Sequence, residues 1–328
     1  MENQEPIFSR PVSRRQFIGT AVAAGAGLST SVSPSSAIIQ PVDKAGRTIC
    51  IFSKHLQWLS LPEVAQTVLA LGFKGVDLTV RKGGHVEPER VTDELPKAIA
   101  ILRKAGLEVP MIVTDIVDAD DPQSESVLKT AGQLGIQYYR MGYLNYDRRT
   151  GVAQNLEQYK KQLQKLARLN QKHNIHGAYQ NHAGTRVGAA VWDLWELLKE
   201  TDPRWLGCQY DIKHAVAEGG LSWVNGLDVI KSHIHCVDIK DFVWAKKDGK
   251  WREEIVPLGE GMVDFKTYFA RLKQYGISGP MSVHYEYTLG GAETGKKQLT
   301  MPPDDVLAAM KRDLQTLQKF LKEAALAE

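Results

Sequence analysis

The chain has 328 residues, with 41 lysines and arginines against 38 aspartates and glutamates, which gives a formal net charge of +3. This near-neutral balance offers no electrostatic case for binding nucleic acid, and no apolar run approaches the roughly 20 residues that a span requires, which argues against stable membrane insertion. The three cysteines are Cys50, Cys208 and Cys236. Their odd number and the lack of C-x-x-C spacing argue against a disulfide scaffold and indicate small buried residues.

The amino-terminal segment has the three parts of an export signal. An arginine pair, Arg14 and Arg15, precedes a weakly apolar stretch at residues 19–28 and then a small-residue patch that ends Ser-Ser-Ala. This order resembles a twin-arginine signal peptide at residues 1–37. The sequence therefore predicts a protein that is periplasmic or otherwise exported by the twin-arginine pathway. A flexible basic tail is the alternative.

From residue 38 to residue 328, strand-like and helix-like segments alternate with short connections. Strands are predicted at residues 48–53, 75–80, 109–115, 138–143, 177–182, 206–212, 234–241 and 281–287. Helices are predicted at residues 61–71, 94–105, 124–134, 155–173, 191–199, 223–230, 264–275 and 304–322. Such alternation is typical of a parallel sheet covered by helices, and eight strands can close into a barrel.

Glycines follow four of the predicted helices and precede the next strand: Gly72, Gly106, Gly135 and Gly276. A left-handed residue at a helix end is easiest for glycine. We therefore predict an α/β fold in which residues 38–328 form one (β/α)8 TIM barrel. An open doubly wound sheet is the alternative, although no G-x-G-x-x-G turn follows the first strand. The longer segments at residues 79–90 and 242–262 are expected to cover the end of the barrel where active sites lie.

Alternate residues of a barrel strand point toward its axis, so the apolar set of each strand shows which side chains face the helices. In the second strand the valines and Leu78 form that helix-facing set, which leaves Asp77, Thr79 and Arg81 inside. In the eighth strand the inward set is Ser282, His284 and Glu286.

The seventh strand allows two inward sets: His235, Val237 and Ile239, or Cys236, Asp238 and Lys240. Burying Asp238 and Lys240 under helices would be costly, so the second set is favoured, and His233 and His235 are not expected to be ligands. The same argument turns further polar side chains toward the axis: Gln180, His182, Gln209 and Asp211.

Polar side chains thus collect at the ends of the last four strands: Gln180, His182, Asp211, His214, Asp238, Lys240, His284 and Glu286. Oxygen and nitrogen ligands of this kind suit one divalent cation such as Mn²⁺, Mg²⁺, Co²⁺ or Zn²⁺. An ion-pair network without a metal is the alternative.

Five motifs carry a resemblance to a known family: YQNH at residues 179–182, YDIKHA at 210–215, DIKDF at 238–242, PLGEG at 257–261 and GPMSVHYE at 279–286. With these motifs, residues 49–321 resemble the xylose isomerase-like TIM barrel family of sugar (phosphate) isomerases and epimerases. The family typically holds one divalent ion with Glu, Asp, His and Glu from the last four strands. The resemblance implies the corresponding ligands here: Gln180, Asp211, Asp238 and His284, with Glu286 two residues further on.

Three of these four positions depart from the family pattern, since Gln replaces Glu, Asp replaces His and His replaces Glu. All three replacements can still coordinate a metal. Their formal charge is −2 instead of −3, so weaker metal affinity is expected unless Glu286 also contributes. Loss of a carboxylate at Gln180 also removes one of the two bases that proton-shuttling isomerases often use.

The sequence and the resemblance together predict a metal-dependent sugar isomerase or epimerase that acts on a small sugar or keto-sugar. Its central step would be proton abstraction next to a carbonyl through a metal-stabilised enediolate. Glu286 is the expected general base, His182 or His214 its acid partner, and Lys240 or Arg81 the group that stabilises the oxyanion. The expected substrate-binding residues are Asp77, Arg81, His85, Arg140 and Trp244.

Two alternative functions stay open. A lyase or hydratase acting on 3-keto-glycosides would fit the altered ligand set and export. A non-catalytic periplasmic sugar-binding protein would fit a scaffold that has lost its ligands. A homo-oligomer is compatible with the sequence.

Overall fold

The computed structural model describes residues 47–326, so the predicted signal at residues 1–37 lies outside the described residues. Eight parallel strands close into a barrel in the order β1, β10, β7, β6, β5, β4, β3, β2. They are β1 (Ile49–Phe52), β2 (Gly75–Thr79), β3 (Glu108–Val113), β4 (Tyr138–Arg140), β5 (His176–Gln180), β6 (Leu206–Asp211), β7 (Ile234–Ile239) and β10 (Met281–Val283). The predicted (β/α)8 barrel is confirmed.

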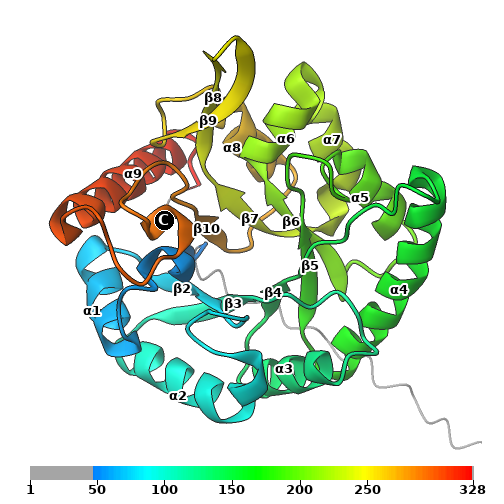
Figure 1. The fold of residues 1–328 in the computed structure, drawn as a ribbon, viewed down its shortest axis with the longest axis horizontal. Coiled ribbons are helices and arrows are strands. Elements are labelled where there is room, and N and C mark those ends of the chain that lie inside the picture. Colours follow the sequence, from blue (N-terminus) through cyan, green and yellow to red (C-terminus); the bar gives the residue numbers. More distant parts are fainter. Residues whose placement is uncertain (1–46, 327–328) are drawn as a thin grey trace, which may run out of the picture. The chain divides into compact units, whose positions relative to one another are not determined.

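A ring of helices surrounds the strands (Figure 1). The predicted helices are α1 (Leu61–Leu71), α2 (Val91–Lys104), α3 (Pro122–Gln133), α4 (Val152–Lys172), α5 (Val191–Leu198), α7 (Trp223–Ile230), α8 (Phe265–Gln274) and α9 (Pro303–Glu323). Short 3-10 turns are η1 (Ser53–Leu56), η2 (Pro88–Arg90), η3 (Gly220–Ser222), η4 (Lys231–His233) and η5 (Ala292–Thr294). Among residues 47–326, no helix combines the length and the apolar character needed to span a bilayer.

Helix α1 shows how local sequence sets the helix ends. Ser60 and Glu63 form a capping box, in which the Ser60 backbone N–H donates to Glu63 Oε2 at 2.8 Å. The helix stops at Gly72, whose φ of 98° is costly for any residue with a β-carbon. Between these ends the apolar stripe that includes Val64 and Val68 is buried against the barrel.

The barrel interior has an apolar layer below the polar one. Met111, Ala178 and Cys236 pack together, although they come from β3, β5 and β7, which are not adjacent strands. Side chains from alternate strands can meet only across the axis of the barrel. Cys236 therefore points inward, which supports the predicted inward set of β7.

Two elements depart from the prediction. The segment after β7 is a regular antiparallel hairpin, β8 (Asp241–Lys247) and β9 (Lys250–Val256), followed by a tight turn. An additional helix, α6 (Ile212–Gly219), follows β6 directly without a loop. The Asp241 carboxylate accepts hydrogen bonds from the backbone N–H groups of Gly259 and Gly261, each at 3.0 Å. The DIKDF and PLGEG motifs are thus joined by a structural contact that holds the base of the hairpin.

Candidate active site

The polar cluster is built from residues at the carboxyl ends of β5, β6, β7 and β10. Asp211 ends β6 and caps α6, where its Oδ1 accepts the backbone N–H of His214 at 3.1 Å. Asn181, the residue after β5, fixes Asp211: its Nδ2 donates to the Asp211 carbonyl at 2.9 Å, and its Oδ1 accepts the Asp211 backbone N–H at 2.8 Å. Asp238 lies inside β7, and His284 follows β10.

Three of the predicted metal ligands lie together. Asp211, Asp238 and His284 are all buried, and each offers one ligand atom within 4.8 Å of the others. His284 Nε2 lies 3.2 Å from Asp238 Oδ1, yet neither nitrogen of this buried ring makes a hydrogen bond. The ring is held by stacking on Phe52, with centroids 4.6 Å apart. Two carboxylates and an unsatisfied imidazole fit a divalent cation held by three protein ligands.

Gln180 is close to the same atoms but presents its amide nitrogen. Its Nε2 donates to Asp211 Oδ2 at 2.9 Å and to Asp238 Oδ2 at 2.5 Å. Its Oε1 accepts from Arg140 Nη1 at 3.0 Å and from the Tyr143 hydroxyl. Turning the amide over would set its NH₂ group against these donors and its oxygen against two carboxylates, so the neighbours dictate the orientation. In this arrangement Gln180 bridges the carboxylates, and its role as a metal ligand stays a prediction.

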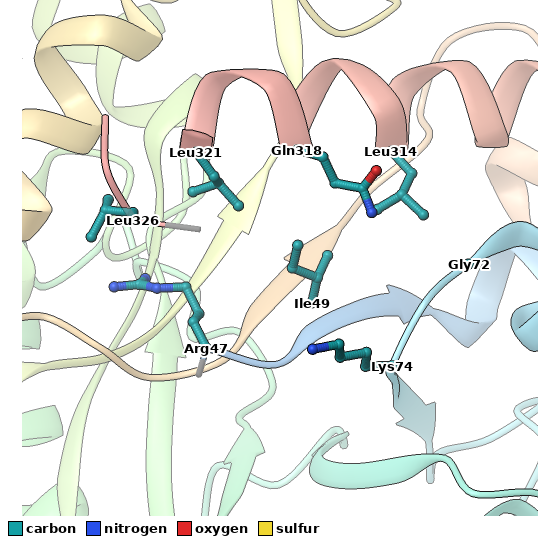
Figure 2. Close-up of a pocket in the computed structure, with 8 residues that line it drawn as sticks. All are labelled: Arg47, Ile49, Gly72, Lys74, Leu314, Gln318, Leu321 and Leu326. Carbon is teal, nitrogen blue, oxygen red and sulfur yellow. The ribbon is translucent and has the colours of Figure 1, made fainter. Parts of the chain in front are cut away.

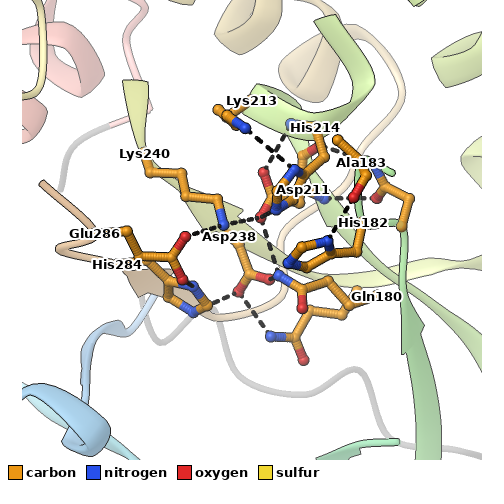
Figure 3. A network of polar contacts seen from close by, with 12 residues as sticks. Gln180, His182, Ala183, Asp211, Lys213, His214, Asp238, Lys240, His284 and Glu286 are labelled. Atoms are coloured by element: carbon orange, nitrogen blue, oxygen red, sulfur yellow. Dashed lines mark hydrogen bonds and ion pairs between the residues drawn. The ribbon is translucent and has the colours of Figure 1, made fainter. Parts of the chain in front are cut away.

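Lys240 places an ammonium group between Asp211 and Glu286. Its Nζ lies 3.1 Å from Asp211 Oδ2 and 2.9 Å from Glu286 Oε2, and its side chain is 1% exposed. Lys54 reaches the other oxygen of Glu286 at 3.3 Å. Two predicted catalytic residues, Lys240 and Glu286, are therefore in direct contact, next to the candidate metal ligands (Figure 3).

Burial and neighbouring charges set the protonation states of these groups. Burial raises the pKa of Asp238 to about 7, against the lowering effects of Arg140 and Lys240. Burial would also raise the pKa of Glu286, but Lys240 and Lys54 bring it well below its ordinary value. Burial would lower the pKa of Lys240, whereas Asp211 and Glu286 hold it above its ordinary value. Glu286 is thus ionised and Lys240 is protonated at neutral pH.

The two predicted acid partners form a stacked pair. The rings of His182 and His214 have centroids 4.0 Å apart, and His214 Nε2 lies 3.6 Å from Asp211 Oδ2. Burial, followed by the charge of Lys240, lowers the pKa of both rings, and that of His214 lies well below its ordinary value. Both rings are therefore neutral at neutral pH, and their lowered pKa makes them weak proton acceptors.

The predicted substrate residues divide into two groups. Arg140 is 5% exposed and contacts Gln180, and Asp77 is buried and accepts from Ser282 Oγ at 2.8 Å. His85 and Trp244 have no hydrogen bond or ion pair to the centre among the described residues. His85 pairs with Thr79 Oγ1 at 3.1 Å, and Trp244 is 40% exposed on β8.

Sequence reasoning missed three side chains of the site: Lys54, Tyr143 and Phe52. Phe52 ends β1, Lys54 follows β1 and Tyr143 follows β4, and a position at the carboxyl end of a barrel strand is the signal that would have found them. Lys54 lies in η1 and pairs with Glu286, and Tyr143 donates to Gln180. Their partners are distant in sequence, so no local pattern connects them.

A separate hollow lies between α9 and the start of β1, at the opposite end of the strands (Figure 2). This cavity of about 190 Å³ is lined by Arg47, Ile49, Gly72, Lys74, Leu314, Gln318, Leu321 and Leu326. It brings together leucines and two cations, without a carboxylate or a histidine in its lining. We assign it no catalytic role, because such a lining provides neither a base nor a set of metal ligands.

Comparison with known proteins agrees with the barrel fold. Residues 65–316 match the family model described as xylose isomerase-like TIM barrel. A D-tagatose 3-epimerase-like protein has a similar structure, with 15% identity, coverage of 85% of this chain and 98% of that chain, and a TM-score of 0.63. The 3-keto-D-glucoside 4-epimerase YcjR from E. coli is 13% identical, with coverage of 83% and 99% and a TM-score of 0.60.

A third similar structure is a xylose isomerase-like TIM barrel protein from Mycobacterium smegmatis in complex with magnesium. It is 13% identical, with coverage of 82% of this chain and 98% of that chain and a TM-score of 0.58. No curated protein matches the sequence. Likeness at these identities concerns the fold, so the chemistry must be argued from the side chains of this chain.

Proposed function

The chain belongs to the xylose isomerase-like TIM barrel family, and we propose that it is a metal-dependent enzyme that isomerises or epimerises a small sugar or keto-sugar. The observation that carries the proposal is the buried group of Asp211, Asp238 and His284, with the Glu286 carboxylate beside it. The magnesium complex supports the choice of a cation, and the D-tagatose 3-epimerase-like protein and the 3-keto-D-glucoside 4-epimerase support the choice of a sugar.

A divalent cation held by Asp211, Asp238 and His284 would supply Lewis-acid chemistry that polarises a substrate carbonyl. The side chains around it would do the proton transfer. Glu286 is ionised and 25% exposed, so a substrate carbon that enters the barrel can reach it as a general base. Lys240 would donate a hydrogen bond to the oxygen on which negative charge develops.

Lys240 and Glu286 are coupled in a way that helps this step. In the free protein, the ammonium groups of Lys240 and Lys54 lower the pKa of Glu286, which makes the carboxylate a weak base. When Lys240 turns to the substrate oxygen, Glu286 loses part of this stabilisation, and its affinity for a proton rises. His182 or His214, both neutral, would take up the proton and return it to another carbon.

One carboxylate base beside a glutamine favours a second candidate. Two-base isomerases need carboxylates on both sides of the substrate, whereas Gln180 can only donate or accept hydrogen bonds at neutral pH. A lyase acting on a 3-keto-glycoside needs a single base for proton abstraction and an acid for the leaving group. The two chemistries are separable, because elimination releases an aglycone and epimerisation does not.

The test combines metal analysis with an assay. Purified protein is analysed for Mn, Mg, Co and Zn, and is assayed against a panel of ketoses and 3-keto-glycosides with and without added ion. Glu286→Gln and Asp211→Asn should each abolish turnover with unchanged circular dichroism. Glu254→Gln, on the exposed hairpin, is the matched control. Full activity in either site variant would refute the role assigned to that residue.

We further propose that the protein is exported by the twin-arginine pathway, on the basis of Arg14 and Arg15 in residues 1–37. Replacing both arginines with lysine should retain the protein in the cytoplasmic fraction of a bacterial host. Equal amounts of wild type and variant in the periplasmic fraction would contradict this proposal. A homo-oligomer also stays a prediction, to be measured by light scattering.

A further inference from the structure

Three arginines gather beside the candidate metal ligands, around two aromatic rings. The guanidinium carbons of Arg81 and Arg140 lie 5.6 and 5.3 Å from the centre of the Phe52 ring. Those of Arg140 and Arg186 lie 5.7 and 4.5 Å from the centre of the Tyr143 ring. These residues end or follow β2, β4 and β5, so they line the same end of the barrel as the catalytic residues.

The three arginines have no ion-pair partner among residues 47–326. Arg140 is 5% exposed, and its one hydrogen bond goes to Gln180, which leaves its Nε buried and unsatisfied. Burial and then the like charge of Arg140 lower the pKa of Arg81, which shows that the two cations repel each other. The carboxylate of exposed Asp115 acts to raise the pKa of Arg81, but the two residues form no ion pair.

The carboxylates nearby are already engaged. Glu286 pairs with Lys54 and Lys240, and Asp211 pairs with Lys240. Asp77 accepts from Ser282, and Asp238 accepts from Gln180 and Gln209. Burial would lower the pKa of Arg140, whereas Tyr143, Asp238 and Asp77 hold it above its ordinary value, but neither carboxylate forms an ion pair with it. A buried guanidinium that forms no ion pair and keeps an unsatisfied donor is costly.

Arginine is also the residue whose planar donors match a carboxylate or a phosphate. The buried, unsatisfied Nε of Arg140, together with the guanidinium groups of Arg81 and Arg186, which form no ion pair, therefore points to an anion that comes from outside the protein. Asp211 and Glu286 pair with the lysines of the centre, and no carboxylate among residues 47–326 forms an ion pair with the three arginines.

We propose that the substrate is an acidic sugar, and that its anionic group, a carboxylate or a phosphate, is bound by Arg81, Arg140 and Arg186. The inference rests on the proposed function for the sugar itself and adds the class of sugar. Binding of the anion on this side would turn the rest of the sugar toward Glu286 and the candidate metal ligands.

Calorimetry on the whole protein with added MnCl₂ tests the proposal. The probes are D-glucuronate, D-galacturonate and D-glucose 6-phosphate, each compared with its neutral parent, D-glucose or D-galactose. At least one acid should bind at least tenfold more tightly than its parent, and the difference should shrink as salt is added. The acid that binds identifies the anionic group as carboxylate or phosphate.

Variants assign the effect to the arginines. Arg81 and Arg186 are partly exposed, so the double variant Arg81→Gln, Arg186→Gln should fold, which circular dichroism checks. The affinities of this double variant for the acid and for its parent sugar should lie within about threefold of each other. Arg148→Gln, an exposed arginine on the loop after β4, should keep the full preference.

The possible failures are distinguishable. Acidic and neutral sugars that bind equally well overturn the acidic-sugar inference and leave the proposed sugar function standing. A double variant that keeps the preference overturns the role of the arginines. A folded protein that binds none of the five sugars overturns this inference, whereas the proposed function is decided by the metal analysis and the panel of ketoses and 3-keto-glycosides.

Discussion

Replacing Lys240 with methionine would exchange a buried ammonium for an apolar side chain of similar length. Its two contacts, at 3.1 Å to Asp211 and 2.9 Å to Glu286, would be lost. Each attraction amounts to roughly 5 kcal/mol at an effective dielectric constant of about 20, and desolvation of the ammonium offsets much of it. Because Asp211 loses its counter-ion and Glu286 keeps only Lys54, we expect the metal-free protein to lose about 3–5 kcal/mol of stability.

Lys240 also competes with a metal for Asp211, so the same substitution should raise the affinity for Mn²⁺ by at least about tenfold. Thermal unfolding after dialysis against EDTA should show a Tm about 10 °C below that of the wild type. Addition of MnCl₂ should restore most of this loss in the variant and raise the wild type less. Calorimetric titration with Mn²⁺ measures the affinity directly.

Lys246→Met is the matched control, because Lys246 is exposed on β8. It should leave both Tm and Mn²⁺ affinity unchanged. If Lys240→Met in EDTA unfolds at the wild-type temperature and binds Mn²⁺ no more tightly, then Lys240 is not the counter-ion of the candidate metal ligands, and the reasoning fails.

Gln180→Glu replaces an amide donor, 2.5–2.9 Å from two carboxylates, with a third carboxylate. The variant should therefore bind Mn²⁺ more tightly than the wild type and unfold at a lower Tm in EDTA. Calorimetry that shows weaker Mn²⁺ binding would contradict this. Burial, followed by His235, lowers the pKa of His176 to about 3, below the unfolded value of about 6.5. The contribution of neutral His176 to stability is therefore present above pH 6.5 and is lost as the pH falls toward 3. Urea unfolding at about pH 7.5 and about pH 5 should show that His176→Gln loses less free energy of unfolding than the wild type between these pH values. An equal loss in variant and wild type would exclude this cause. Ser60→Ala should cost about 1 kcal/mol through the capping box of α1, and equal urea midpoints for variant and wild type would show that the cap contributes nothing.

Local sequence alone predicted the barrel strands and the helices around them. Two-residue alternation and helical stripes are properties of neighbouring residues, and glycine ends such as Gly72 need only a left-handed backbone. The same alternation placed Asp77, Asp238 and Lys240 inside, because a charged side chain under a helix would be costly. Helix α6 was missed, because it begins at Ile212 directly after β6, with no loop residues to separate the two patterns.

Tertiary structure decided which of the inward side chains touch. Lys54 and Glu286 are 232 residues apart and meet only because β10 closes on β1. The orientation of Gln180 likewise depends on donors from Arg140 and Tyr143, and no pattern around residue 180 contains that information. Sequence therefore determines which side chains point to the axis, because that depends on local backbone geometry. Barrel closure determines which of them share a proton, a charge or a metal, since those interactions act over a few ångströms in space.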